Sequence, residues 1–173
     1  MATVKSVKSA IKSSDYVAKS ISYILSPETK SGNEKCVQSS FINCCYDSVN
    51  GLVNQFDITR FAYHKNDKIL AHHYVQSFSP NENITPELAH KLAMTFVRKN
   101  FGDEVQAVIA THVDKSHVHN HIIVNSYSLS GQKLYANRDA LRKARENING
   151  ICRAFGITPA LNFEKKGAVS RLL

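Results

Sequence analysis

The sequence has no apolar run of the roughly 18 residues that a membrane-spanning helix needs, so we expect no membrane insertion. Its first residues, MATVKSVKSAIKSSDYV, alternate polar and apolar side chains and lack the continuous apolar stretch of a secretory signal. Internal repeats and low-complexity blocks are also absent. These absences exclude membrane, secreted and fibrous classes and favour a globular chain.

Cysteine is scarce and carries no metal-binding spacing. The four cysteines, Cys36, Cys44, Cys45 and Cys152, form no CxxC pair. Adjacent residues such as Cys44 and Cys45 rarely both turn toward one ion, so a structural zinc site is disfavoured. We expect reduced thiols, mostly buried, in a cytosolic protein, and we expect the chemistry to lie elsewhere.

Acidic residues are also few, with 14 Asp and Glu against 22 Lys and Arg, a formal net charge of +8. This excess favours a polyanionic partner, and nucleic acid more than a membrane because no basic amphipathic anchor stands out. A basic surface that only confers solubility is the alternative. With 173 residues, of which 43% are hydrophobic and 21% charged, the chain is long enough for one packed domain spanning residues 1–173.

Hydrophobic spacing and capping residues predict an alternation of helices and strand pairs. We expect a polar loop over 27–40 and leave 41–56 unassigned. The predicted helices are 13–26, 86–100 and 138–155, and the predicted strands are 57–64, 68–78, 105–112 and 118–127. This order indicates an α+β sandwich in which helices cover an antiparallel sheet.

The last predicted helix combines an apolar stripe with a basic one. The apolar stripe consists of Leu141, Ala144, Ile148, Cys152 and Phe155. Arg138, Arg142 and Arg145 recur at helical spacing on the other side, and Lys133 lies just before them. These cations either track DNA phosphates or form a solvated helix face.

The densest local feature is a group of histidines. Residues 112–121, HVDKSHVHNH, hold four of the eight histidines, where uniform scatter would place about 0.5. Side chains alternate along a strand, so His119 and His121 share one face. If residues 113–118 form a loop, His112 pairs with His119 on the neighbouring strand.

This pattern predicts a metal site made of His112, His119 and His121, with His117 outside it. Three protein ligands leave coordination positions open, as in catalytic sites. Asp114 is placed to accept the second N–H of a ligand imidazole. The alternative is that these histidines are ordinary surface or core residues.

At this point the sequence resembles the relaxases, mobilisation nucleases of the HUH endonuclease superfamily, and in particular their MobA-like branch. The segment HVDKSHVHNHIIVN resembles the family's histidine motif, and SYILSPETK resembles its N-terminal tyrosine motif. HHYVQSFSPNENITPELAH and GQKLYANRDALRKARENINGICRAFGI resemble its middle and closing segments, so the likeness covers about residues 10–160. The resemblance implies a ferredoxin-like α+β sandwich with the metal at the centre of an antiparallel sheet.

The resemblance also implies an activity. Relaxases nick one strand at an origin of transfer, join a tyrosine to the 5′ phosphate and leave a free 3′ hydroxyl. Tyr23 matches the nucleophile, and Tyr16, which shares its helix face, is the rival. Asp114 and Glu82 match acidic positions near the metal. The metal implied is one divalent ion, Mg²⁺ or Mn²⁺ in the cell, whereas three imidazoles also suit zinc or nickel in a purified sample.

The implied partner is origin-of-transfer DNA, single-stranded or supercoiled, with accessory mobilisation proteins as further partners in the bacterial cytoplasm. Relaxases of this kind generally carry further domains, so the resemblance also suggests the N-terminal part of a longer protein. Three other functions stay open. They are a rolling-circle replication initiator, which the motif order disfavours, a basic nucleic-acid-binding module with a structural metal, and a metal-dependent hydrolase of small phosphate esters.

Overall fold

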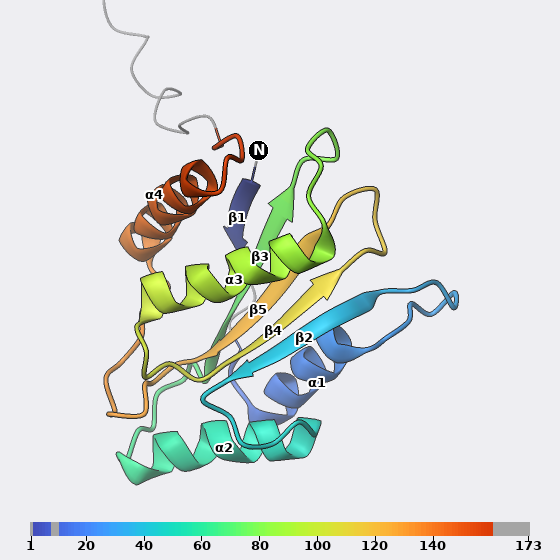
Figure 1. The fold of residues 1–173 in the computed structure, drawn as a ribbon. Coiled ribbons are helices and arrows are strands. Elements are labelled where there is room, and N and C mark those ends of the chain that lie inside the picture. The colour runs from blue at the N-terminus through green and yellow to red at the C-terminus, as the bar shows by residue number, and fades with distance from the viewer. Residues whose placement is uncertain (1, 8–10, 161–173) are drawn as a thin grey trace, which may run out of the picture.

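The computed structural model describes residues 2–7 and 11–160, which form one five-stranded sheet and four helices. Figure 1 shows the sheet between two layers of helices. In chain order the elements are β1 (Ala2–Ser6), α1 (Ser14–Leu25), β2 (Cys36–Ile42), α2 (Val49–Ala62), β3 (Ala71–Phe78), α3 (Pro86–Phe101), β4 (Ala107–His112), β5 (His119–Asn125) and α4 (Arg138–Ala154).

The strands pair antiparallel throughout, in the order β1-β3-β5-β4-β2. The α+β sandwich with a helix-covered antiparallel sheet is therefore confirmed. Every residue of β4 and β5 is buried, because these strands lie inside the sheet with helices on both faces. Within the described residues, no helix is long and apolar enough to cross a membrane.

Alternation along β5 divides the core into two halves. Ile122 and Val124 point to the face covered by α3 and α4, where they join one apolar cluster. Ile123 points to the other face, where α1 and α2 contribute a second cluster. His119 and His121 share the face of Ile123, so the histidine pair lies under the layer that contains α1.

The predicted helices near 13–26, 86–100 and 138–155 are confirmed, as are the strands near 68–78, 105–112 and 118–127. Their caps follow the sequence: Ser13 accepts a hydrogen bond from Tyr16 N, and Thr85 accepts one from Leu88 N. In α4 the buried stripe includes Ile151, whereas Phe155 is 37% exposed at the C-cap. The assignment of Phe155 to the core is therefore wrong.

The predicted strand over 57–64 is wrong, because these residues form the second half of α2 and the turn after it. The buried positions of α2 follow helical spacing, whereas Ile58 and Phe61 are more than 60% exposed. The segment 57–64 does not include Ser48, whose side chain caps the first turn of α2, so the capping signal of this helix lies outside it. Two of the apolar residues that suggested a strand, Ile58 and Phe61, lie on the exposed face of this helix.

The polar segment 27–40 is also only partly a loop. Its last five residues belong to β2, an edge strand that pairs with β4. An edge strand carries polar residues because one side faces solvent, so β2 lacks the apolar pattern that marks a buried strand. The strand β1 at the opposite edge is likewise absent from the sequence prediction. The described cysteines are free thiols, of which only Cys152 is buried.

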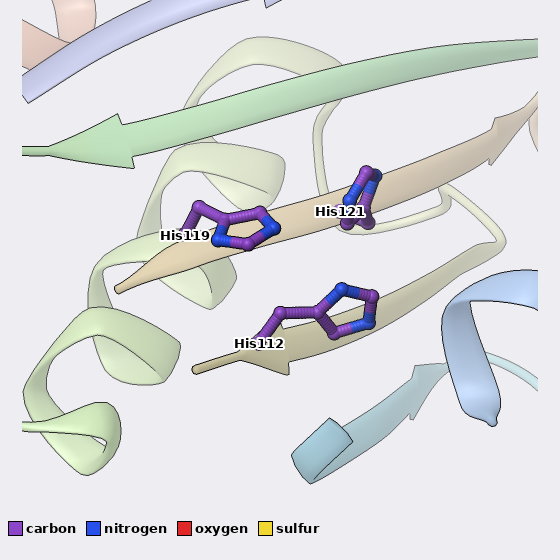
Figure 2. Close-up of side chains that lie close together, drawn as sticks. All are labelled: His112, His119 and His121. Carbon is purple, nitrogen blue, oxygen red and sulfur yellow. The ribbon is translucent and has the colours of Figure 1, made fainter. Parts of the chain in front are cut away.

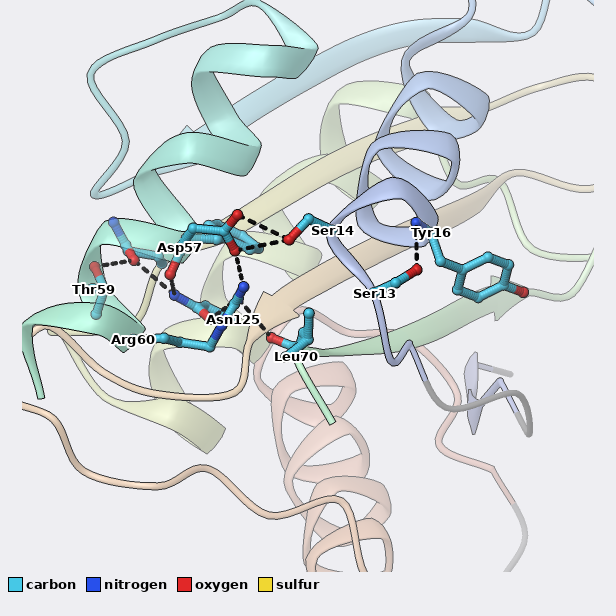
Figure 3. Close-up of polar contacts among 10 residues, drawn as sticks. Ser13, Ser14, Tyr16, Asp57, Thr59, Arg60, Leu70 and Asn125 are labelled. Atoms are coloured by element: carbon cyan, nitrogen blue, oxygen red, sulfur yellow. Dashed lines mark hydrogen bonds and ion pairs between the residues drawn. The ribbon is translucent and has the colours of Figure 1, made fainter. Parts of the chain in front are cut away.

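A polar network ties the start of α1 to α2 and the sheet (Figure 3). Asp57 accepts hydrogen bonds from Ser14 Oγ, the shorter at 2.9 Å, and pairs with the Arg60 guanidinium. Arg60, whose side chain is 3% exposed, also donates to Leu70 O at 3.3 Å and to Asn125 Oδ1 at 3.4 Å. Burial lowers the pKa of Arg60, and the Asp57 carboxylate together with these acceptors compensates the guanidinium for its lost contact with water.

Replacing Asp57 with alanine should lower the free energy of unfolding by about 3 kcal/mol, because it leaves the buried Arg60 charge without its carboxylate. Chemical denaturation measures this change. Glu146→Ala is the matched control: it removes an exposed ion pair with Arg142 and should cost less than about 1 kcal/mol. Equal stability of the Asp57→Ala variant and the parent would contradict this account of the network.

Candidate metal centre

Three histidines gather where β4 ends and β5 begins (Figure 2). His112 pairs with His119 across the two strands, and Ala110 pairs with His121. The predicted register is therefore confirmed, and it places all three imidazoles on one face. One nitrogen from each ring lies within 4.8 Å of the others, which is close enough for one ion.

In each of the three rings one nitrogen has a neighbour outside the histidine cluster, which leaves the other nitrogen for the cluster itself. His112 Nε2 donates to Ile24 O at 2.7 Å, because a carbonyl can only accept. His119 Nδ1 faces His117 O at 3.4 Å, and His121 Nδ1 lies 2.9 Å from His73 Nε2. His112 Nδ1 is buried and has no hydrogen-bond partner. A lone pair that is buried and unmatched fits a metal ligand.

Burial also keeps these rings uncharged. It lowers the pKa of His119 to about 4 and that of His121 to about 2, and it lowers the pKa of His112 as well. Neutral imidazole is the form that coordinates metals, since the imidazolium has no free lone pair. The group can therefore accept a cation at neutral pH without first losing protons.

Asp114 lies beside the group but does not take the expected hydrogen bond. Its Oδ1 is 3.6 Å from His119 Nε2, and that oxygen is buried with no hydrogen-bond partner. The N–H groups of His112 and His119 that point away from the centre face the backbone carbonyls of Ile24 and His117 instead. Asp114 therefore faces the side of His119 on which an ion would lie.

Tyr23 from the last turn of α1 lies against the histidines. Its ring centroid is 5.8 Å from that of His121 and 6.5 Å from that of His112, both in edge-on geometry. Tyr23 is 54% exposed, so its phenol remains open to a large substrate. Tyr23, rather than its rival Tyr16 on the same helix, is thus the tyrosine that we carry forward as the candidate nucleophile.

Lys35 is a further residue at the site. Its Nζ lies 3.6 Å from the Tyr23 ring centroid and donates to Tyr23 O at 2.5 Å. Lys35 is only 4% exposed, and burial lowers its pKa while the charge of Asp114 acts in the opposite sense. It carries no recognisable sequence pattern, because it stands in a polar segment with several other charges.

Glu82 does not join this group. Its carboxylate accepts a hydrogen bond from Thr158 N at 2.9 Å, just past the end of α4. This contact ties Glu82 to the segment after α4, a helix that packs on the face of the sheet opposite the histidines. The structure therefore gives no support to a role for Glu82 at the metal.

The four predicted DNA-binding residues lie near the start of α4 and not along one exposed stripe. Lys133 Nζ pairs with Asp67 at 2.8 Å, Arg142 pairs with Glu146, and Arg138 is exposed at the first position of the helix. Arg145 turns toward the sheet, where its Nε donates to Val4 O at 3.3 Å. Lys133 and Arg145 line a cavity of about 1180 Å³ together with His73.

Sequence comparison gives the chain a family. Residues 23–157 match the family model described as Relaxase: MobA/VirD2-like, nuclease domain. A group II intron-interrupted relaxase LtrB of Lactococcus lactis subsp. cremoris is 51% identical over 65 residues, which are 38% of this chain and 12% of that protein. A Protein rlx of Staphylococcus aureus is 36% identical over 129 residues, covering 72% of this chain and 38% of that protein. The chain thus spans well under half the length of these relatives.

The fold has solved counterparts. A MobM relaxase domain bound to plasmid pMV158 oriT DNA, in a Mn-bound crystal structure, superimposes with a TM-score of 0.67. The match covers 99% of this chain and 95% of that one at 12% sequence identity, so it concerns the fold alone. The family-model match extends over most of the chain, from Tyr23 through the histidine cluster and α4. This chain belongs to the MobA/VirD2-like relaxase family of nuclease domains.

Proposed function

We propose that this chain nicks one strand of origin-of-transfer DNA in a metal-dependent, site-specific reaction. Tyr23 Oη attacks the scissile phosphorus, and the bond from phosphorus to the 3′ oxygen breaks. The products are a 5′-phosphotyrosine and a free 3′ hydroxyl, and the covalent bond conserves energy for rejoining the strand. The observation that carries the proposal is the exposed phenol of Tyr23 beside three clustered, neutral histidines.

We assign His112, His119 and His121 as the ligands of one divalent cation. Three neutral imidazoles leave the ion its full charge and open positions for phosphate oxygens. When bound, such a cation would polarise the non-bridging oxygens and stabilise the charge that develops in the transition state. The MobM relaxase domain is described as Mn-bound, which favours Mn²⁺ as the ion to test first.

The remaining residues would place the nucleophile and manage its proton. A phenol is a weak acid, so its attack requires an acceptor for the proton that the 3′ oxygen later regains. We assign that acceptor role to Asp114, because its buried Oδ1 has no hydrogen-bond partner. Lys35 would hold the Tyr23 ring and the last turn of α1 in place.

The DNA would approach over a basic surface. The net charge of +8 favours phosphate contact, and salt bridges such as Lys133–Asp67 lie at the surface where phosphates can replace the carboxylate. We propose that Lys133, Arg138, Arg142 and Arg145 contact the backbone of the strand near the cavity beside His73. In the related MobM structures the bound nucleic acid is oriT DNA of plasmid pMV158.

Tyr23→Phe should abolish formation of the covalent adduct, because phenylalanine has no oxygen to attack phosphorus. The assay incubates the chain and Mn²⁺ with a single-stranded origin oligonucleotide labelled at its 3′ end and separates the products on a denaturing gel. In the parent chain the 3′-labelled fragment should migrate with the protein, and the 5′ fragment should be extended by a polymerase from its 3′ hydroxyl.

Tyr16→Phe is the matched control, since Tyr16 lies on the same helix, and it should keep the adduct. An adduct that persists in Tyr23→Phe and disappears in Tyr16→Phe would overturn the assignment of the nucleophile. Cleavage into free fragments with no adduct would favour the phosphate-ester hydrolase. No cleavage with any divalent metal would favour the non-catalytic binding module.

His119→Ala should weaken Mn²⁺ binding by more than about 100-fold and reduce cleavage to background. The loss of a metal ligand should lower the affinity more than the loss of a residue that only hydrogen-bonds to a ligand, which typically costs about 10- to 100-fold. Free Mn²⁺ measured by electron paramagnetic resonance gives the affinity. DNA binding in EDTA should keep its salt dependence, since the Lys and Arg contacts remain. His117→Ala, a change in the same motif, should leave Mn²⁺ affinity unchanged. Unaltered Mn²⁺ affinity in His119→Ala would contradict the ligand assignment.

A further inference from the structure

His73 is a histidine of β3 that reaches the cluster from the neighbouring strand. It pairs with Ile123 of β5, so it lies diagonally across from His121 on the same face of the sheet. Its Nε2 is 2.9 Å from His121 Nδ1, and the two ring centroids are 5.1 Å apart. The adjacent His72 points to the other face, where its Nε2 bonds to Leu134 O.

The contact sets His121 apart from the other two rings of the cluster. His112 and His119 direct their outer nitrogens to main-chain carbonyls, which no side-chain substitution removes. His121 directs its outer nitrogen to a side chain. The orientation of one ring in the cluster therefore depends on the identity of residue 73.

The direction of this hydrogen bond follows from the chemistry of imidazole. A neutral ring carries one proton, and the nitrogen without it supplies the lone pair. If His121 is to offer Nε2 to a cation, its proton must sit on Nδ1 and be donated to His73 Nε2. His73 then carries its own proton on Nδ1. This is the role that carboxylates and carbonyls usually fill behind a ligand histidine.

We propose that His73 is a positioning residue that accepts the Nδ1 proton of His121 and thereby fixes its tautomer and ring orientation for metal binding. The inference rests on the proposed function only in that the cluster binds a divalent cation. It requires no contact between His73 and DNA. Its effect reaches the metal through His121.

The test compares an acceptor with a non-acceptor at residue 73. His73→Leu removes the acceptor and should weaken Mn²⁺ binding about 10- to 100-fold, the loss typical for an outer partner of a ligand. His73→Gln keeps an acceptor oxygen and should stay within about threefold of the parent. His72→Leu is the matched control on the opposite face and should not change Mn²⁺ affinity. Mn²⁺ titrations followed by electron paramagnetic resonance give the three affinities.

A second measurement does not depend on the metal. In the metal-free parent at neutral pH, nitrogen NMR of ¹⁵N-labelled histidine should show His121 protonated at Nδ1 and His73 unprotonated at Nε2. His73→Leu should lose this tautomer preference, whereas a thermal unfolding scan without metal shows whether the variant still folds.

Parent-like Mn²⁺ affinity in a folded His73→Leu variant would overturn the proposal, and so would Gln weakening the affinity as much as Leu. A His121 protonated at Nε2 would overturn it as well, because that nitrogen could not then bind a cation. If the parent binds no Mn²⁺ and cuts no DNA, the proposed function fails. The NMR measurement then decides the His73 contact separately.

Discussion

The antiparallel pairing of β4 with β5 is the constraint on which the site depends. It sets His112 opposite His119 and brings His121 to the same face, two pairs further along. A shift of either strand by one residue would turn its histidines to the opposite face. The burial of both strands fixes the register, since such a shift would also move Val108, Ala110 and Ile123 out of their core cluster.

Three buried imidazoles have lost the hydrogen bonds that water would give them. Ile24 O, His117 O and His73 replace some of those bonds. Burial also holds the rings in the neutral form. The unmatched Nδ1 of His112 and the unmatched Oδ1 of Asp114 remain. Native proteins rarely bury unmatched polar atoms, and the open Nδ1 of His112 suits the cation that we propose at the three histidines.

The helix α1 is held at both ends. At its start, Ser14 bonds to Asp57 in the network with Arg60, and at its end Lys35 and His112 bond to the carbonyls of Tyr23 and Ile24. The last of these contacts joins the helix with the tyrosine directly to a member of the histidine cluster. The exposed phenol is therefore carried by a fixed backbone, which suits the attack on phosphate that we propose for it.

The sequence by itself determined the strongly periodic helices, the buried strands and the histidine group, because apolar spacing and the alternation of side chains are local properties of the chain. It also predicted that His112 faces His119, since a short loop between two strands leaves few possible registers. The helix that contains Asp57 and Arg60 could not be predicted in this way, because it buries polar side chains in a network that only the folded chain completes.

The tertiary structure alone decided which residues surround the three histidines. Lys35 lies just before the edge strand β2 and His73 lies on a third strand, and neither is near the histidine motif in sequence. The motif resemblance placed Glu82 near the metal, but its hydrogen bond to Thr158 N holds it beside α4. Contacts between residues far apart in the chain depend on the order of strands in the sheet, and local spacing does not specify that order.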